Sequence, residues 1–544
     1  MILKTAIIAL ALSQVVSGAK ILFFFGFSTY TDRITVWPLV EALVAKGHEV
    51  TFLSPYTPQE KEKNPKVVEL HPPALVEVMS AGFGNVLERR LENSHESLWH
   101  DFREKGTQVC EAIFKEDESR EYFKNAEFDL LIINSLHNEC AYGLAYKYSA
   151  PFMLFGTSSV FLWQPDTYGF FPETSWIPDV TMKISLPLAF LQRVHNTLHP
   201  IYWYVTRHWN DFPEMDKILR EALEIKRMPP LEELEKNTSL ILQNNHYSIE
   251  FARTLPPLFV SVAGLHIQEP GKREPLPKEV EQFVEESEEE GFMYISFGPL
   301  VNISSMSDTF QNVLYDVLGS FNIRFVWSWN EPRPEKMPSN VMTTPWVPQQ
   351  TILAHPKIKG FISHAGLLSV QESVANGVPL VVLPVFMEQD YNAEKVERQG
   401  YGIRVEIARL KREGLSDAIS NILNEPKYTE KALEMSKLFL DRPMKPLETA
   451  VWWTEYVLRH KGSVNLTPWS QSQNWFQRRT LDVYGFLLSI VFFLMIVFYI
   501  LMRQVCLMIL AFDEDEEESK SKHSSPQGSP KFKRPGKYIK QKYL

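Results

Sequence analysis

Cysteine is scarce in this chain, which has only three, Cys110, Cys140 and Cys506, among 544 residues. Three thiols cannot build a disulfide framework or a cysteine-rich metal cluster, so neither is expected, and no metal site is predicted. Cys110 and Cys140 could pair with each other, and two free buried thiols fit the sequence equally well.

Two other features are missing. No glycine-rich phosphate loop of the G-x-x-x-x-G-K-[S/T] type and no G-x-G-x-x-G fingerprint occurs, which disfavours ordinary nucleoside-triphosphate or dinucleotide binding. A basic excess is missing too, because 56 Lys and Arg stand against 66 Asp and Glu, a formal net charge of −10. This balance excludes nucleic acid as an expected partner.

The length and overall composition indicate a globular protein with more than one core. A chain of 544 residues exceeds one ordinary domain. Its hydrophobic content of 44% and charged content of 22% are ordinary for globular proteins.

Both ends of the chain carry targeting features. Residues 1–19 contain Lys4, an apolar run and then small residues, which is typical of a cleaved secretory signal peptide. Residues 483–502 are uncharged and apolar. At ~1.5 Å rise per residue they span roughly 30 Å, which is one bilayer core, so we predict a transmembrane helix.

This topology places residues 20 to about 480 in a lumen and the tail, 503–544, in the cytosol. The tail is acidic and then rich in Ser, Pro and Lys from residue 513, so disorder is expected there. It ends K-Q-K-Y-L, which resembles the dilysine retrieval signal of endoplasmic-reticulum membrane proteins. The luminal part holds three glycosylation sequons, at Asn237, Asn302 and Asn465.

Between these ends, apolar strand-like runs alternate with helical stretches, which predicts an α/β fold. We expect a first domain over 20–268, a Pro-containing linker over 269–290, a second α/β domain over 291–440 and helices leading to the membrane over 441–482. The aromatic segment 156–230 could be internal packing or could line an apolar acceptor pocket.

The most informative segment is 345–389. It reads as an apolar strand, a tight turn at His364, a helix and a second apolar strand, which make a β-α-β unit with parallel strands. In such units ligands bind beyond the strand carboxyl ends, where the helix N-terminus presents free N–H groups and partial positive charge. The segment therefore predicts a diphosphate site with His364 as an added donor.

Seven residues of this segment resemble, in order and spacing, the signature of the UDP-glycosyltransferases, the membrane-anchored animal family that includes glucuronosyltransferases. They are Trp346, Gln349, His364, Gly366, Ser369, Glu372 and Gln389. The stretches 21–55, 293–298 and 450–462 are also similar to parts of this family, so the resemblance covers nearly the whole chain.

The resemblance implies the GT-B arrangement of two facing Rossmann-like domains, the first binding the acceptor and the second the UDP-sugar. It implies that Trp346 stacks on uracil, that Gln349 and Glu372 hold base and ribose, and that His364 and Ser369 contact the diphosphate. Ser296 and Gly366 belong to the same donor site, and Glu388 and Gln389 would hold the sugar. UDP-sugar is then a co-substrate, and no cofactor is expected.

The family's catalytic pair differs in this chain. The family uses a histidine after the first strand, oriented by an aspartate after a later strand. The corresponding positions here hold Asp32 and Asn134. One negative charge is kept, and an amide can donate to a carboxylate. We hypothesise that Asp32 is a weaker base, held by Asn134, which would favour acidic acceptors such as phenols because an ordinary Asp has a pKa of about 3.9.

Two alternatives stay open. His137 and Glu139 could supply a replacement base. The base could also be lost, since Pro299, Ala365 and Glu388 stand where the family usually has Ser, Gly and Asp. The chain would then be a membrane-anchored nucleotide-sugar or lipophile binding protein.

Our prediction is an inverting UDP-glycosyltransferase of the endoplasmic-reticulum membrane. It would move glucose, glucuronic acid or a similar hexose to a small lipophilic acceptor. The acceptor, the sugar and the formation of a homo-oligomer are left open by the sequence.

Overall fold

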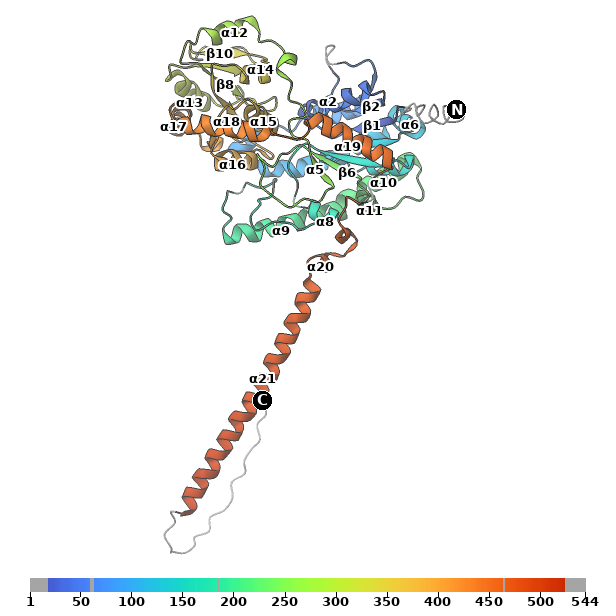
Figure 1. The fold of residues 1–544 in the computed structure, drawn as a ribbon, viewed down its shortest axis with the longest axis vertical. Coiled ribbons are helices and arrows are strands. Elements are labelled where there is room, and N and C mark those ends of the chain that lie inside the picture. The colour runs from blue at the N-terminus through green and yellow to red at the C-terminus, as the bar shows by residue number, and fades with distance from the viewer. Residues whose placement is uncertain (1–17, 59–62, 162, 184, 463–464, 524–544) are drawn as a thin grey trace, which may run out of the picture. The chain divides into compact units, whose positions relative to one another are not determined.

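The computed structural model describes residues 18–58, 63–161, 163–183, 185–462 and 465–523. The chain separates into two compact units, Met1–Ser472 and Gln473–Leu544, and each is described by itself. The first unit holds two α/β halves built on separate sheets (Figure 1). The predicted signal peptide falls almost entirely outside the described residues, as do Lys540 and Lys542.

The first sheet has seven parallel strands in the order β3-β2-β1-β4-β5-β6-β7. Both faces of its central strands are buried, as in β1 with its sequence KILFF, because helices cover a parallel sheet on both sides. The apolar runs of the sequence predict five strands in this half, and each run coincides with a strand: 21–25, 50–53, 130–133, 152–155 and 240–243. The strands are β1 (Lys20–Phe24), β2 (Glu49–Leu53), β3 (Val67–Leu70), β4 (Leu130–Asn134), β5 (Phe152–Gly156), β6 (Leu240–Gln243) and β7 (Phe259–Ser261).

The helices of this half pack by apolar stripes. In α10 the buried residues Phe212, Met215, Leu219 and Leu223 recur every three or four positions, which puts them on one face. The helices are α2 (Tyr30–Ala45), α3 (Pro73–Ser80), α4 (Val86–Leu91), η2 (His95–Ser97), α5 (Leu98–Lys115), α6 (Asp117–Asn125), α7 (Ala141–Tyr148), α8 (Gln164–Tyr168), α9 (Phe190–Thr206), η3 (Arg207–Asp211), α10 (Phe212–Leu223) and α11 (Leu231–Glu235).

A disulfide joins two of these helical regions. Cys110 in α5 is bonded to Cys140, which directly precedes α7, with their Cα atoms 6.2 Å apart. The structure thus decides between the two alternatives that the sequence left open. Cys506 is free and exposed.

The second sheet has six parallel strands in the order β10-β9-β8-β11-β12-β13. The strands are β8 (Phe292–Ser296), β9 (Arg324–Ser328), β10 (Val341–Thr344), β11 (Ile358–Ser363), β12 (Leu380–Val382) and β13 (Gly402–Arg404). Its helical elements are η4 (Pro270–Lys272), α12 (Lys278–Glu285), α13 (Asp308–Gly319), α14 (Gln349–Leu353), α15 (Leu367–Ala375), α16 (Gln389–Gln399), η5 (Ile407–Arg409), α17 (Arg412–Asn424) and α18 (Pro426–Leu440). The predicted β-α-β unit is β11, α15 and β12, and β11 and β12 pair in parallel.

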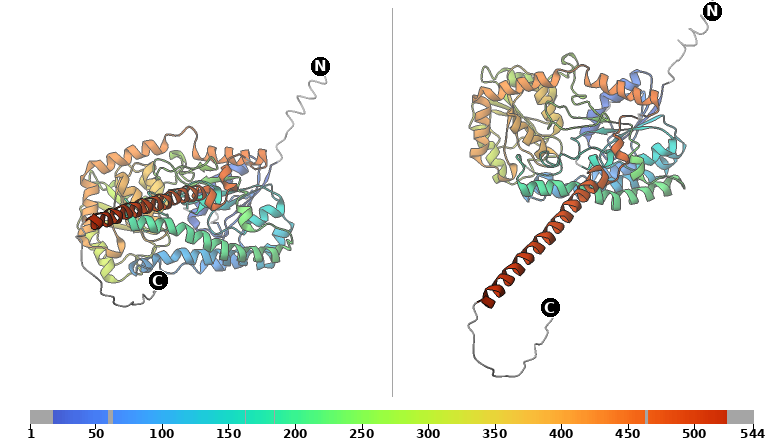
Figure 2. Two further views of the ribbon diagram at one scale, coloured as in Figure 1. Left: turned by 90° about the horizontal axis from the view of Figure 1, so that it is seen from below. Right: turned by 60° about the horizontal axis from the view of Figure 1, so that its bottom comes forward.

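Two segments outside the predicted domains take part in their cores. Helix α12, in the expected linker, buries Val280 and Val284 in a core cluster of the second half. Helix α19 (Pro446–His460) returns to the first half, where Ala450 and Val457 join a core cluster. Figure 2 shows this orange segment passing from the second half to the first. The first unit ends with η6 (Trp469–Ser472).

The second unit consists of α20 (Trp475–Arg478) and the long helix α21 (Leu481–His523). The predicted membrane span, 483–502, lies inside α21, and Leu481–Lys520 is long and apolar enough by length and composition to cross a membrane. The expectation of disorder from residue 513 needs correction, because α21 continues to His523. Glu and Lys are good helix formers, and Lys520 pairs with Glu516 one turn away.

Candidate functional site

The predicted diphosphate site lies at the carboxyl ends of β8 and β11, which are neighbours in the second sheet. Helix α15 begins after Gly366, and no side chain caps its first N–H groups. The imidazole of His364 fills the space beside it. A Cβ atom added to Gly298 or Gly366 would lie 3.0 or 2.6 Å from the Nε2 of His364. Both glycines therefore leave room for this ring.

His364 is a neutral hydrogen-bonding group in this setting. Burial lowers the pKa of His364 to about 4, against a smaller opposing effect of the Ser296 backbone. Its Nδ1 atom is buried without a hydrogen-bond partner among the described residues. The ring can therefore donate to a diphosphate, but positive potential must come mainly from the α15 N-terminus unless the ligand itself raises this pKa.

Three of the predicted donor residues form one hydrogen-bonded cluster. The Gln349 Nε2 atom donates to Ser369 Oγ over 3.0 Å and to Glu372 Oε2 over 2.6 Å. The other Glu372 oxygen accepts from Gln350 Nε2 over 3.2 Å and lies 3.4 Å from His266 Nε2. Gln350 and His266 were not predicted from the sequence. Gln350 could have been found in the sequence because it is a glutamine next to the predicted Gln349. No sequence signal pointed to His266.

Trp346 lies between β10 and α14, and its side chain is 51% exposed. An exposed indole beside the Gln349 cluster is suited to stacking on a flat base.

The predicted sugar residues stand at the start of α16. Gln389 Oε1 accepts from Val385 N over 2.9 Å and from Phe386 N over 3.1 Å, so this oxygen holds the turn before the helix. Burial raises the pKa of Glu388 to about 7, and the charge of Asp32 adds to this effect while Lys395 opposes it. Asp32 belongs to the first half, so the two carboxyl groups lie close enough across the halves for their charges to interact.

Asp32 is the third residue of α2 and takes part in its capping box. Its Oδ2 accepts from Thr29 N over 2.7 Å and from Thr29 Oγ1 over 3.0 Å. Burial raises the pKa of Asp32 above its ordinary value, while hydrogen bonds with Thr29, Thr157 and Asn134 lower it in part. The base is thus stronger than the unperturbed Asp assumed from the sequence.

The groups around Asp32 come from three neighbouring strands. Asp32 follows β1, Asn134 ends β4 and Thr157 follows β5. Asn134 also contacts the preceding loop, since its Nδ2 donates to Phe27 O over 3.4 Å. The structure therefore brings Asp32 and Asn134 together, as predicted, and adds Thr157, whose signal was a hydroxyl directly after a predicted strand.

His137 and Glu139 have other surroundings. Burial lowers the pKa of His137 to about 3, and the ring packs edge-on against Phe27 at 5.2 Å between centroids. Glu139 is buried and lies 3.1 Å from the guanidinium of Arg207. His137 is therefore a poor proton acceptor at neutral pH, and the Glu139 carboxylate is already paired with Arg207.

Two departures from the family pattern have structural explanations. Ala365 has φ = +65°, the region that favours glycine, and its side chain is fully buried in a core cluster. The methyl group therefore does not crowd the diphosphate site. Pro299 lies in an exposed turn directly after Gly298 and offers no N–H to a phosphate.

Helices α15 and α16 are also attached to the first half, which the sequence did not indicate. On α16, Tyr391 and Lys395 reach Glu250 over 2.5 and 3.2 Å. Gln371 on α15 accepts from Gly264 N over 2.9 Å and donates to Asn244 O over 3.2 Å. These pairs are more than 100 residues apart, so no local pattern could reveal them.

The buried Arg90 of α4 makes a further contact between the two halves. Its guanidinium nitrogens lie 2.5 to 3.0 Å from the carboxylate oxygens of Asp390 and Glu406. Asp390 directly follows Glu388 and Gln389, the residues predicted to hold the sugar. The first half thus contacts the start of α16 through one ion-pair cluster.

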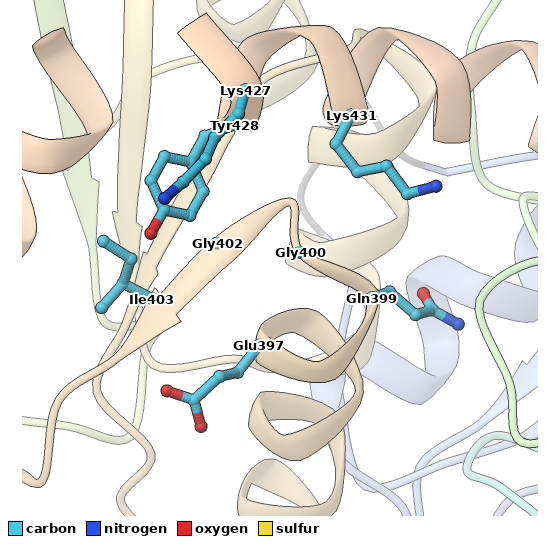
Figure 3. Close-up of a pocket in the computed structure, with 8 residues that line it drawn as sticks. All are labelled: Glu397, Gln399, Gly400, Gly402, Ile403, Lys427, Tyr428 and Lys431. Atoms are coloured by element: carbon cyan, nitrogen blue, oxygen red, sulfur yellow. The ribbon is translucent and has the colours of Figure 1, made fainter. Parts of the chain in front are cut away.

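Other hollows lie away from these residues. One at the start of β13 is shown in Figure 3, and its lining includes Glu397, Gly400, Lys427 and Lys431. It contains none of the predicted site residues. Within the described ranges, no group of three His, Cys, Asp or Glu residues is arranged to hold a metal ion.

The predicted glycosylation residues Asn237, Asn302 and Asn465 are all exposed. Asn302 accepts from Ser304 N over 3.0 Å, which forms a local turn. The three positions are therefore accessible on the first unit.

Two parallel Rossmann-like sheets joined in one unit make the GT-B fold. The crystal structure of CalG4, the calicheamicin glycosyltransferase, has the same fold, with a TM-score of 0.54 at 17% identity over 81% of this chain and 99% of that one.

The family model for UDP-glucoronosyl and UDP-glucosyl transferase matches residues 23–514, and the chain belongs to this family. It is 29% identical over 478 residues to human UDP-glucuronosyltransferase 2B15, covering 85% of this chain and 89% of the relative. It is also 29% identical over 476 residues to UDP-glucosyltransferase 2 of Dactylopius coccus, covering 87% and 90%. The two relatives are named for different sugars, so these similarities do not decide the donor sugar.

Proposed function

We propose that this chain transfers a hexose from a UDP-sugar to a hydroxyl group of a small lipophilic acceptor, with inversion, and that Asp32 is the base. The observation that carries this proposal is the position of Asp32 in α2, which follows β1, close enough to Glu388 of the other half for the charge of Asp32 to raise the pKa of Glu388. A base that deprotonates the acceptor must stand between the acceptor half and the sugar.

The reaction requires one proton transfer and one substitution. The acceptor O–H gives its proton to the Asp32 carboxylate as its oxygen attacks the anomeric carbon. The bond from that carbon to the diphosphate oxygen breaks, and UDP leaves with the electron pair. The free N–H groups of α15 and the neutral ring of His364 stabilise the departing diphosphate.

Asn134 and Thr157 would hold Asp32 in its ionised form, since hydrogen bonds with both lower its pKa against the effect of burial. Trp346, Gln349 and Glu372 would bind the uridine. Glu388 has a pKa of about 7, so near neutral pH it can either donate a hydrogen bond to the sugar or accept one from it.

We place the enzyme in the endoplasmic-reticulum membrane, with α21 as a single span and the first unit in the lumen. The apolar span and the three exposed sequons support this topology. A lumenal location also fits the Cys110–Cys140 disulfide, because such bonds persist in oxidising compartments.

One observation favours a second candidate, a nucleotide-sugar binding protein without turnover. The Asp32 Oδ2 atom already accepts two hydrogen bonds from Thr29, so the carboxylate has a structural role in capping α2. A group held for this purpose need not act as a base.

A UDP-release assay on membranes, with several UDP-sugars and a panel of phenols, tests the proposal. Asp32→Asn is the informative variant, because an amide oxygen can still accept from the Thr29 N–H and keep the cap while it cannot take the proton. We expect at least a ~100-fold loss of turnover with UDP-sugar binding retained.

Asp129→Asn is the matched control. Asp129 accepts from Lys20 N over 2.8 Å at the opposite end of the same strands, so turnover should not change. Equal turnover in Asp32→Asn and the wild-type enzyme would refute the role of Asp32. A wild-type protein that binds UDP-sugar and releases no UDP above background would establish the second candidate.

A further inference from the structure

Asn138 lies in the loop between β4 and α7 and is 1% exposed. Its amide group makes four hydrogen bonds to the backbone. Oδ1 accepts from Phe27 N over 2.8 Å, and Nδ2 donates to Phe27 O over 2.9 Å. Nδ2 also donates to Asn134 O over 3.2 Å and to Leu136 O over 2.7 Å. One side chain, which takes no part in the proposed reaction, therefore joins two loops.

The two loops that Asn138 joins carry the groups of the candidate site. Phe27 lies two residues before Thr29, the N-cap of α2, whose backbone N–H and hydroxyl bind the Asp32 carboxylate. On the other side, Asn134 is the last residue of β4, which is the neighbour of β1 in the sheet. A shift of either loop would therefore change the distance between Asp32 and Asn134.

One carbonyl group connects Asn138 to Asn134. Phe27 O accepts from the Nδ2 atoms of both residues, over 2.9 Å from Asn138 and over 3.4 Å from Asn134. The Asn134 Oδ1 atom accepts from Leu136 N over 3.3 Å, so the NH₂ group of this amide points the other way. An amide has two N–H donors, and one can bind Phe27 O while the other binds Asp32. The 3.4 Å contact is long, so a small shift of Phe27 O would break it.

Helix α5 holds the turn that orients Asn138. His137, directly before it, has φ = +56°, a region that disfavours residues other than glycine. A Cβ atom added to Gly106 of α5 would lie 2.5 Å from the His137 Cβ, so the helix packs directly against the turn. Cys140 is bonded to Cys110 of the same helix. A disfavoured turn held in this way indicates that the direction of Asn138 matters.

We propose that Asn138 is a positioning residue for the transfer reaction. It holds the loop before Asp32 against the loop after Asn134, and through Phe27 O it directs the Asn134 amide toward the Asp32 carboxylate. This inference rests on the proposed function, in which Asp32 is the base.

Other ionisable groups also surround Asp32. Tyr56 follows β2, and burial together with the charge of Asp32 raises its pKa to about 12. His137 is neutral, because burial lowers its pKa to about 3. Burial raises the pKa of Glu388 to about 7, with a smaller effect of the Asp32 charge. Of these three groups, Glu388 titrates near neutral pH, so its contribution has to be separated from that of Asp32.

The test is the pH profile of turnover by the full-length membrane protein. UDP release is measured with UDP-glucose and with UDP-glucuronic acid. The acceptor is 4-methylphenol, which stays un-ionised below about pH 9, as tyrosine does. The acid limb of the kcat profile reports the pKa of the base in the enzyme–substrate complex. Every profile is repeated in a Glu388→Gln background, so that a limb due to Glu388 is recognised.

We expect Asn138→Ala to move the acid limb to higher pH. Burial raises the pKa of Asp32 and the Asn134 amide lowers it in part, an effect that is lost when the amide turns away. We also expect kcat to fall at least ~10-fold, since a misplacement of about 1 Å can cost about 100-fold. The KM for the UDP-sugar should stay the same, because the residues predicted to bind it lie in the second half.

Two comparisons separate positioning from stability. Asn340→Ala removes a similar amide, whose Nδ2 donates to three carbonyl oxygens at the connection between α13 and β9 over 2.9 to 3.0 Å. It should lower the melting temperature and leave the acid limb in place. Asn134→Ala should move the limb as Asn138→Ala does. The double variant should move it no further, because the two residues act in series.

Hydrogen–deuterium exchange tests the contact without any turnover. The Phe27 N–H is bonded to Asn138 Oδ1, so we expect faster exchange over 25–32 and over 134–140 in Asn138→Ala. Asn340→Ala should exchange there like the wild-type protein. If Asn138→Ala does not fold, Asn138→Ser keeps one hydroxyl donor for the carbonyl groups and should move the limb in the same direction by less.

The outcomes are distinguishable. An unmoved acid limb in the Asn138 variants, a further shift in the double variant, unchanged exchange over 25–32, or a shift that disappears in the Glu388→Gln background would each overturn the role of Asn138. Asp32→Asn is measured beside them. If it keeps wild-type turnover, the proposed function fails and the role of Asn138 fails with it. If it loses turnover while the Asn138→Ala limb is unmoved, the role of Asn138 fails alone.

Discussion

Arg90 is the side chain on which we expect the contact between the two halves to depend most. It is fully buried, and its guanidinium meets the carboxylates of Asp390 and Glu406 from the other half. Arg90→Met keeps an apolar side chain of similar length and removes the charge. Two carboxylates then lose their shared cation in a site from which water is largely excluded.

The magnitude follows from the remaining contacts. Removing one partner of a buried ion pair costs about 3–5 kcal/mol. Asp390 keeps Arg404 at 2.5 Å and Glu406 keeps Lys183 at 2.6 Å, so we expect the lower end, about 3 kcal/mol.

The pKa of Glu406 gives the pH range over which this contact should matter. Burial alone would raise this pKa, but hydrogen bonds from Arg90 and Lys183 lower it from 4.5 to about 2. The stability from this lowered pKa is present above pH 4.5 and is lost as the pH falls through about 2.

The assay is thermal unfolding of the purified protein, with Arg89→Met as the matched control. Arg89 is the neighbouring residue on α4, but its pair with Asp101 is partly exposed and should contribute about 1 kcal/mol or less. We expect Arg90→Met to unfold at a clearly lower temperature than Arg89→Met at pH 7. The difference should shrink between pH 4.5 and pH 2.

A second substitution checks the mechanism. Adding Glu406→Gln to Arg90→Met removes one unpaired carboxylate and should recover part of the lost stability. UDP release should also fall in Arg90→Met, because Asp390 adjoins Glu388 and Gln389. Equal unfolding temperatures for the Arg89 and Arg90 variants would refute the reasoning.

Three further predictions concern single sites. The pKa of Glu388 is raised from 4.5 to about 7, so its ionisation lowers the stability of the protein as the pH rises from 4.5 to 7. Glu388→Gln should therefore raise the melting temperature more at pH 8 than at pH 5. An equal gain at both pH values would contradict this. Replacing Cys110 and Cys140 by Ala opens a 30-residue loop and should cost about 4 kcal/mol in urea unfolding, while an unchanged midpoint would show that the bond adds nothing. Ala365→Gly relieves a positive φ but loses a buried methyl group, so the free energy of unfolding should change by less than about 1 kcal/mol. A manyfold rise in UDP release by this variant would show instead that the methyl group crowds the UDP-sugar.

The regular parts of the fold were predictable from the sequence. Apolar runs such as 130–133 and 152–155 marked parallel strands because such strands are buried on both faces. The β-α-β unit around His364 was equally legible, since Gly366 and Gly377 bound its helix in the sequence and in the structure. These features depend on residues that are close together along the chain.

The rest depends on contacts between distant residues. Nothing near α19 indicates that it packs on the first half, because an amphipathic helix can cover either sheet. The Cys110–Cys140 bond could not be predicted without the relative positions of α5 and α7. The capping role of Asp32 did have a local signal, a threonine three residues earlier, but the family alignment drew attention to catalysis alone.

For the candidate site, the sequence indicated which residues to expect, but it could not show what surrounds each of them. The sequence identified Asp32 and Glu388 separately, whereas burial raises the pKa of both and the charge of Asp32 raises that of Glu388 further. The domain limits and the roles of the donor residues stay predictions.

The contacts of Gln371 and Tyr391 with the first half have a consequence for protein engineering. Family members are natural material for chimaeras that join the acceptor half of one to the donor half of another at the connection near residue 290. In this chain such a junction would separate Gln371 from Asn244 and Tyr391 from Glu250. A graft that exchanges first halves must therefore carry matching residues on α15 and α16, or the position of these two helices will change along with the first half.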